Sequence, residues 1–291
     1  MKILVLGSKG QLGTDLLEVF GPAHVVRGVD IDDFDITSFS DCREIIAEFG
    51  PEAVVNAAAY TDVDGCETQR DLCFAVNAEG VRNIARVCSD RGIRVVHFST
   101  DYVFDGTKGK PYVEEDLCNP INAYGQSKLQ GEIYLKEQAG DYLLIRTAWL
   151  YGRTGKNFVK AILDKARHEK KLRVVNDQVG SPTYSADLAL AVRLLLERNH
   201  AGVFNVTNRG RCSWYEFAVR IVQYAQIPDV EIEAISSDML RRQALRPAYS
   251  VLSCRKFIQE TRKTTRYWQV ALKDFVAKTW VKKNVPKTDD A

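Results

Sequence analysis

The sequence predicts an α/β fold: a Rossmann-type doubly wound parallel sheet with a smaller C-terminal α/β substrate domain. In the first half, short apolar runs alternate with longer helical patterns, and a glycine-rich turn directly follows the first run. The runs are apolar at consecutive positions, which is typical of strands covered by helices on both faces. With 291 residues, the chain is long enough to bury a large core in one or two domains.

The expected elements of the first half follow one another in strict alternation. We expect strands at Lys2–Gly7, Val25–Asp30, Ala53–Asn56, Val95–Ser99 and Tyr142–Arg146. Helices are expected at Leu12–Phe20, Ser40–Phe49, Leu72–Arg91 and Ala123–Gln138. Because parallel strands are joined by crossovers that usually contain a helix, this order predicts right-handed crossovers and a parallel sheet.

The pattern changes after residues 149–152, where a turn-rich polar stretch interrupts it at residues 176–183. Helices are expected at Asn157–His168, Ser185–Arg198 and Trp268–Trp280, with another one starting after Ser213. Strands are expected at Leu172–Val175, Val203–Val206 and Val230–Ala234. The second of these strands and the helix before it are expected to return to the first sheet. The predicted dinucleotide-binding domain therefore comprises residues 1–151 plus 184–211, and the substrate domain residues 152–183 plus 212–291.

Composition and charge exclude several classes of protein. The 40 Lys and Arg nearly balance the 38 Asp and Glu, so a net charge of +2 gives no case for nucleic acid or a membrane as partner. The seven cysteines are scattered without a Cys-x-x-Cys pair and the four histidines are isolated, so we expect no disulfide framework and no metal site. The apolar run near the N-terminus is too short for a signal sequence. These features predict a cytoplasmic protein.

Gly7, Gly10 and Gly13 stand between the first expected strand and the first expected helix. Glycine there permits a tight turn and a close approach of the backbone to a pyrophosphate, while the helix N-terminus supplies amide donors. Asp30 ends the second strand about 20 residues later, where an acid suits the ribose of NAD. Lys9 and Arg27 would instead suit a 2′-phosphate, so the cofactor is expected to be NADPH or NADH.

Tyr124 and Lys128 lie four residues apart in an expected helix, which places the phenol and the ammonium on one face. A tyrosine pKa near 10 suits proton transfer poorly at neutral pH, and an adjacent ammonium stabilises the phenolate. Thr100 ends the fourth strand and is the candidate to hydrogen-bond a substrate ketone, with Ser99 as second choice. Glycine loop, hydroxyl and Tyr/Lys pair follow in the order expected of a ketone reductase.

Several motifs give the sequence a specific resemblance to a known family. They are Gly7–Gly13, Asn56–Asp64, Ser99–Phe104, Tyr124–Lys128, Arg146–Gly152, Asn157–Phe158, Asn176–Thr183 and Arg246–Ser250. In these motifs, the chain resembles the extended short-chain dehydrogenase/reductases and, within them, the dTDP-4-dehydrorhamnose reductases. The resemblance extends over nearly the whole chain. It implies hydride transfer from NAD(P)H to C4 of dTDP-4-dehydro-L-rhamnose.

The resemblance also implies a role for individual residues. Tyr124 would protonate the developing alkoxide, Thr100 would orient the carbonyl, and Lys128 would hold the ribose and tune Tyr124. The cofactor is expected to contact Gly7, Lys9, Gly10, Gln11, Leu12, Gly13, Asp30, Asp35, Ile36, Ala57, Ala58, Ala59, Tyr60, Tyr124 and Lys128. The dTDP-sugar is expected to contact Thr100, Asp101, Tyr102, Val103, Trp149, Asn176, Gln178 and Arg246.

Three alternatives share this scaffold. A dehydratase would need an acid pair, but Tyr102 follows Asp101 where a glutamate is expected. A nucleotide-sugar epimerase and a non-catalytic cofactor-binding subunit both stay open. Some members of the family bind magnesium between subunits through acidic side chains. Here Asp15 follows Gly13-Thr14, but no acid is obvious near Thr279 and Trp280, so no metal is expected and the protein is expected to be a monomer or a homodimer.

Overall fold

The computed structural model describes residues 1–281, whose central element is a six-stranded sheet. Its strands are β1 (Lys2–Leu6), β2 (Val25–Val29), β3 (Ala53–Asn56), β4 (Arg94–Thr100), β5 (Tyr142–Thr147) and β10 (Gly202–Asn205). They lie in the order β10-β5-β4-β3-β1-β2, and every neighbouring pair is parallel. The predicted doubly wound parallel sheet is therefore confirmed.

Strand β1 lies between β2 and β3, so the winding direction reverses at this point. Leu6 at the end of β1 is in register with Val29 on one side and with Asn56 on the other. The loops that leave these three strands consequently emerge together at the carboxyl edge of the sheet. A ligand in an open α/β fold binds at such a switch point.

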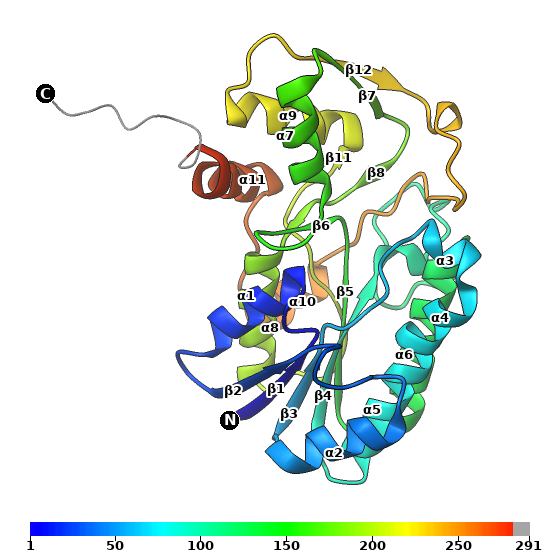
Figure 1. The fold of residues 1–291 in the computed structure, drawn as a ribbon, viewed down its shortest axis with the longest axis vertical. Coiled ribbons are helices and arrows are strands. Elements are labelled where there is room, and N and C mark those ends of the chain that lie inside the picture. The colour runs from blue at the N-terminus through cyan, green and yellow to red at the C-terminus, as the bar shows by residue number, and fades with distance from the viewer. Residues whose placement is uncertain (282–291) are drawn as a thin grey trace, which may run out of the picture.

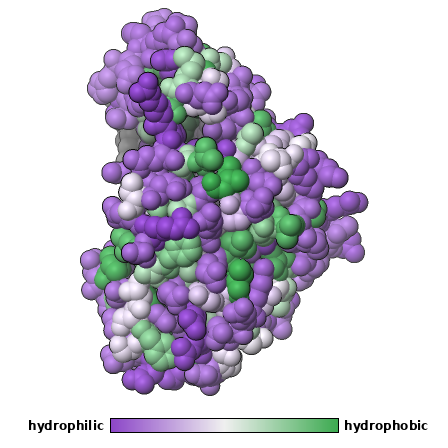
Figure 2. All heavy atoms as spheres, turned by 90° about the vertical axis from the view of Figure 1, so that its right-hand side faces the viewer, coloured by the Kyte–Doolittle hydropathy of each residue, from purple (hydrophilic) through white to green (hydrophobic). Residues whose placement is uncertain are grey.

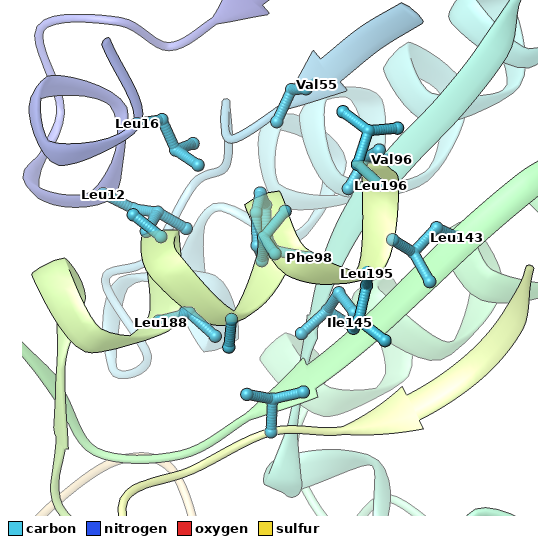
Figure 3. Close-up of a cluster of buried hydrophobic side chains, with 14 of the residues drawn as sticks. Leu12, Leu16, Val55, Val96, Phe98, Leu143, Ile145, Leu188, Leu195 and Leu196 are labelled. Atoms are coloured by element: carbon cyan, nitrogen blue, oxygen red, sulfur yellow. The ribbon is translucent and has the colours of Figure 1, made fainter. Parts of the chain in front are cut away.

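Helices cover both faces of the sheet (Figure 1). Helices α1 (Gln11–Phe20) and α8 (Ser185–Glu197) pack on one face, and α2 (Phe39–Phe49), α5 (Gly80–Ser89) and α6 (Ala123–Gln138) on the other. Figure 3 shows leucines of α1 and α8 meeting apolar side chains of β3, β4 and β5. Each fully buried side chain of this kind contributes about 1.5–3 kcal/mol through burial.

A second unit lies over the carboxyl edge of the sheet (Figure 1). Its helices are α7 (Phe158–His168), α9 (Trp214–Ala225) and α11 (Trp268–Val276), which share one hydrophobic cluster. Strands β7 (Lys171–Val175) and β12 (Glu231–Ile235) form a parallel pair beside them. Two further pairs are short: β6 (Leu150–Tyr151) with β9 (Thr183–Tyr184), and β8 (Val179–Gly180) with β11 (Cys212–Ser213).

We propose that the chain divides into the two domains predicted from the sequence. The return of α8 and β10 to the first sheet supports this division. Helix α10 (Arg255–Thr261) departs from it, because Phe257 packs into the core of the sheet domain. Residues 282–291 of the predicted substrate domain lie outside the described residues.

The single helix expected at Leu72–Arg91 is interrupted in the structure. A π-helical turn at Ala75–Glu79 separates α4 (Arg70–Phe74) from α5, and a short α3 (Gly65–Thr68) precedes them. The wider turn directs Asn77 inwards, where its amide accepts from Tyr60 N and donates to Tyr60 O, both at 2.9 Å. A buried amide with both groups bonded accounts for the distortion, since π-bulges occur where side chains need unusual placement.

The remaining short turns are η2 (Asp101–Val103), η3 (Ser237–Met239) and the π-helical η4 (Ala277–Val281), which continues α11. No helix among residues 1–281 has the length and apolar character needed to cross a bilayer. On the face that carries α3 to α6, hydrophilic side chains separate the apolar ones (Figure 2).

Candidate functional site

The glycine turn after β1 brings the backbone of three segments into close contact. Gly7 has a φ of 73°, and a Cβ on it would lie 2.6 Å from the amide nitrogen of Ala58. A Cβ on Gly13 would overlap the carbonyl oxygen of Gly7. Both positions therefore require glycine. The glycine turn packs directly against the loop that follows β3. Because of this contact, the turn presents backbone atoms at the switch point.

Helix α1 begins at this turn with unsatisfied donors. Its N-cap, Gly10, supplies no side-chain hydrogen bond, and the first turn contains no acidic residue. The amides of the first turn point their positive end towards the switch point, an arrangement that suits a pyrophosphate. The glycines and the uncapped amides together fit a dinucleotide.

Asp30 lies where a ribose-binding acid is expected, directly after β2. Its carboxylate accepts from the amide of Lys9 at 2.7 Å and from the amide of Ile31 at 2.9 Å, so it also fixes the glycine turn. The alternative phosphate ligands are both paired at the surface. The ammonium of Lys9 lies 2.5 Å from Asp32, and the guanidinium of Arg27 lies 2.9 Å from Glu48.

The structure gives other predicted cofactor residues additional structural contacts. Asp35 accepts from the amide and hydroxyl of Thr37, and Ile36 is buried against α2 and α5. Leu12 is part of the core, while the amide oxygen of Gln11 accepts from Asn157 at 2.9 Å. For these residues, contact with a cofactor stays a prediction.

Helix α6 carries Tyr124 in its first turn. The side chain of Asn122 caps the helix by accepting from Gly125 N at 2.7 Å. A Cβ on Gly125 would overlap the carbonyl oxygen of Tyr102, so glycine allows α6 to pack directly against the turn after β4. This contact brings the rings of Tyr124 and Tyr102 to 5.9 Å, edge to face.

Lys128 lies one turn after Tyr124 and is almost completely buried. Its ammonium is 3.4 Å from Nε2 of His97 on β4, whose Nδ1 lies 3.3 Å from the amide of Asn56. Burial lowers the pKa of Lys128 to about 8. Burial and then the charge of Lys128 hold the pKa of His97 well below its usual range, so His97 is neutral beside the ammonium.

Thr100 and Asp101 meet Tyr124 from the end of β4. Burial, followed by the charge of Asp101, raises the pKa of Tyr124, and a hydrogen bond with Thr100 opposes that rise. Thr100 donates its hydroxyl to Asp101 at 3.1 Å. Burial raises the pKa of Asp101 to about 7. The three predicted catalytic side chains therefore lie at one edge of the sheet: Thr100, Tyr124 and Lys128.

A cavity of about 670 Å³ opens between this edge and the second unit. Of the predicted substrate residues, Tyr102, Gln178 and Arg246 line it. Asn176 is exposed, and its amide oxygen accepts from Ser213 at 2.6 Å. The side chain of Val103 is fully buried in a separate apolar cluster. A role for Val103 in substrate binding stays a prediction, and the buried position of its side chain does not support it.

Trp149 has a strained backbone beside this cavity. Its φ is 47°, a left-handed conformation that costs a non-glycine residue about 1–2 kcal/mol. The strain places its indole flat on Trp214, with ring centroids 3.5 Å apart and planes 6° apart. Gly180 lies against the same ring, where a Cβ would overlap it. The stacked indoles join the end of β5 to α9, and Trp214 extends the stack into the cavity wall.

Arg246, a predicted substrate residue, is held by the carboxylate of Asp64. Its guanidinium donates to both carboxylate oxygens of Asp64, at 2.9 and 2.7 Å. Hydrogen bonding from Arg246 lowers the pKa of Asp64 to about 2. This bidentate pairing with Asp64 fixes the orientation of the Arg246 guanidinium at the cavity wall.

Sequence reasoning missed several residues around the cavity. These are Phe158, Lys165, Arg173, Trp214 and Arg242 in its wall, and His97 behind Lys128. Lys165 and Arg173 lie in ordinary amphipathic patterns and Arg242 lies in an irregular segment, so the spacing of these residues carried no signal. Among residues 1–281, no three His, Cys, Asp or Glu side chains are grouped to hold a metal. Asp15 is buried and pairs with Arg153 at 2.8 Å.

Comparison with known proteins gives consistent matches along the chain. A family model described as RmlD substrate binding domain matches residues 1–281. The chain is 39% identical over 276 residues to the spore coat polysaccharide biosynthesis protein SpsK of Bacillus subtilis, covering 94% of this chain and 96% of the relative. It is 38% identical over 269 residues to the dTDP-4-dehydrorhamnose reductase of Burkholderia thailandensis, covering 87% and 90%. The dTDP-4-dehydrorhamnose reductase of Bacillus anthracis, solved in complex with NADP, superposes with a TM-score of 0.93 at 36% identity, covering 96% and 99%.

Proposed function

Because the chain belongs to the RmlD substrate-binding-domain family, we propose that it reduces the C4 ketone of dTDP-4-dehydro-L-rhamnose to dTDP-L-rhamnose. The chain is an oxidoreductase that uses NADPH or NADH, as its NADP-bound structural relative indicates. One observation carries the proposal: Thr100, Tyr124 and Lys128 lie together at one edge of the sheet, beside Tyr102, which lines the same cavity as Arg246.

Each residue contributes a separate physical step. Thr100 donates a hydrogen bond to the ketone oxygen, and Tyr124 delivers its proton to that oxygen as negative charge develops there. Lys128 holds the ribose and lowers the cost of the resulting phenolate through its positive charge. Reduced nicotinamide, when bound, supplies the hydride. Arg246 binds the phosphates of the dTDP-sugar, which fixes the sugar over the catalytic hydroxyls.

Turnover of keto sugar nucleotides tests the proposal directly. Adding dTDP-4-dehydro-L-rhamnose to the protein with NADPH or NADH should remove the absorbance of the reduced nicotinamide. A panel containing the C5 epimer and a UDP-linked 4-keto sugar should give lower kcat/KM values. Folded protein that binds the cofactor but oxidises none of it would instead support a non-catalytic subunit.

Replacing Lys128 with methionine should weaken cofactor binding and move the activity profile to higher pH. In the wild-type protein, the ammonium is present below a pKa of about 8, so activity should fall as the pH rises through that value. Methionine keeps the apolar stem but has no proton to lose, so this alkaline limb should disappear at a lower overall kcat. Full pH profiles of kcat/KM measure the change. Lys136→Met, on the same helix but half-exposed, is the control, and an unaltered profile in the Lys128 variant would contradict the role.

Replacing Asp30 with alanine should change cofactor preference in favour of NADPH. The carboxylate accepts hydrogen bonds from the ribose of NADH and repels the 2′-phosphate of NADPH. Its loss should therefore weaken NADH binding and strengthen NADPH binding. We expect the NADPH-to-NADH ratio of kcat/KM to rise about tenfold, or about 1.4 kcal/mol. Glu44→Ala is the matched control, since it removes one exposed negative charge on α2 and leaves Lys9 paired with Asp32. An unchanged ratio would show that Asp30 does not touch the ribose.

The protein is further proposed to act in the cytoplasm, as a monomer or a homodimer. Its seven cysteines are free thiols, which supports a reducing compartment. Light scattering at several protein concentrations measures the oligomeric state.

A further inference from the structure

Two cysteines lie in contact beneath the catalytic helix. Cys66 comes from α3 and Cys73 from α4, and their sulfur atoms are 2.8 Å apart. Both side chains are fully buried and form a small cluster with Ala123, against which Tyr60 and Tyr124 pack. A disulfide has its two sulfur atoms about 2.0 Å apart, so this contact brings the thiols close to bonding distance.

The surroundings of Cys73 connect it to α6. Its sulfur lies 3.1 Å from the hydroxyl of Ser127, the residue before Lys128, and 3.6 Å from the amide nitrogen of Asn77. The hydroxyl of Ser127 in turn donates to the carbonyl oxygen of Tyr124 at 2.8 Å. A change at Cys73 is therefore transmitted to the backbone of the tyrosine and to the neighbour of the lysine.

The two thiols differ in acidity. The hydrogen bond between the two sulfur atoms lowers the pKa of Cys73, and Ser127, Asn77 and the charge of Lys128 act in the same direction. The pKa of Cys66 is raised. This asymmetry gives one nucleophilic sulfur and one resolving thiol. By contrast, burial raises the pKa of Cys42, Cys88 and Cys212, so these thiols form less of the nucleophilic thiolate than Cys73 does.

We propose that Cys66 and Cys73 form a redox-active dithiol that a peroxide converts to a disulfide, lowering turnover until a small thiol reduces it. In the first step, the Cys73 thiolate attacks one peroxide oxygen, the O–O bond breaks, and hydroxide leaves. The hydroxide takes up the proton that the Cys73 thiol released on ionising, so a sulfenic acid and one water result. In the second step, the sulfur of Cys66 attacks the sulfenic sulfur, and its thiol proton leaves with the hydroxyl as a second water. Together the two thiols lose two electrons, and hydrogen peroxide accepts them and is reduced to two waters.

The coupling to activity follows from the sulfur positions. The sulfur–sulfur distance must shorten from 2.8 Å to about 2.0 Å when the bond forms. Cys73 then loses both its contact with Ser127 and its ability to carry negative charge, and that charge favours the ammonium of Lys128. Oxidation should therefore disturb the tyrosine and the lysine together.

Peptide mapping tests the link independently of the reaction. Arg70 separates the two cysteines, so trypsin places each on its own peptide, residues 44–70 and 71–82, with no other cysteine on either. The full-length protein is treated with hydrogen peroxide, its free thiols are alkylated under denaturing conditions, and the digest is analysed by mass spectrometry. We expect a linked 44–70/71–82 pair that disappears after treatment with dithiothreitol.

Activity is measured on the same samples, and this readout alone rests on the proposed function. The wild type should lose most of its turnover and regain it with dithiothreitol. Cys66→Ser and Cys73→Ser are each compared with their own untreated activity. In neither variant should peroxide cause a loss of turnover that dithiothreitol restores. Cys212→Ala, which removes a buried thiol far from α6, should behave like the wild type.

Several results would overturn the proposal. One is the absence of a linked pair in the folded protein, and another is oxidation confined to the half-buried Cys118 or Cys254. A linked pair with unchanged turnover would also overturn it, because the dithiol is proposed to act on α6. If the protein shows no reductase activity at all, the mapping result still decides whether the disulfide forms.

Discussion

Phenylalanine at position 124 should lower kcat by roughly 10²- to 10⁴-fold, the usual contribution of a positioned acid or base. The substitution removes one oxygen and keeps the ring, so the edge-to-face contact with Tyr102 is retained. Without the hydroxyl, the ketone oxygen has the hydrogen bond from Thr100 but no proton donor. The cofactor Kd should change little, because Lys128 and the glycine turn are unaffected.

Steady-state kinetics and a direct titration of cofactor fluorescence separate these two effects. Tyr134→Phe is the matched control, since Tyr134 lies on the same helix but away from the site. If kcat of the Tyr124 variant equals that of the wild type, Tyr124 has no part in proton transfer. If cofactor binding is lost instead, the hydroxyl acts in binding, and the mechanism needs a different proton donor.

Local patterns were sufficient to predict the sheet and the shared helix face of Tyr124 and Lys128. Consecutive apolar positions and a glycine turn reflect interactions within about 20 residues, and Tyr124 and Lys128 share a helix face whatever surrounds them. The return of α8 and β10 to the sheet could also be predicted, because their pattern repeats that of the first half. Each of these predictions rests on a pattern inside one segment of the chain, even where that segment pairs with a distant one, as β10 does with β5.

Features that depend on distant partners could not be predicted. Arg246 meets Asp64 across 182 residues, and nothing near either residue indicates the pair. The π-helical turn that directs Asn77 inwards interrupts an ordinary helical pattern, and the reason for it is the backbone of Tyr60. Val103 resembles a site residue by its position beside Thr100, yet its side chain is needed in the core. In each case, tertiary packing decides the outcome.

Removing the charge of Glu132 should destabilise the protein by about 3–5 kcal/mol, because it leaves a buried guanidinium unpaired. Glu132 on α6 and Arg146 on β5 are both almost completely buried and joined by hydrogen bonds of 2.9 and 2.7 Å. Denaturant unfolding of Glu132→Gln measures the effect, and Glu137→Gln, exposed on the same helix, is the control. A loss of unfolding free energy below about 1 kcal/mol would contradict a buried ion pair, since exposed ion pairs contribute no more than that.

The pH dependence of this pair has a definite sign. Burial acts to raise the pKa of Glu132, but the hydrogen bonds and charge of Arg146 outweigh it and hold the pKa below its usual value. The stabilisation is therefore complete above the unfolded pKa of about 4.3 and is lost as the pH falls through the lower folded value. In Glu132→Gln, the acid-dependent part of the unfolding free energy should become smaller.

The double variant Glu132→Leu/Arg146→Met separates the cost of an unpaired charge from the value of the pair. Apolar side chains of similar volume should restore most of the stability that either single change removes, because they leave no buried charge. Activity should not recover in parallel. The carboxylate of Glu132 lies one turn after Lys128 and raises the pKa of that ammonium, so its loss should move the alkaline limb of kcat/KM to lower pH. A variant that is stable again but still shifted in pH would show that the buried pair also positions charge for catalysis.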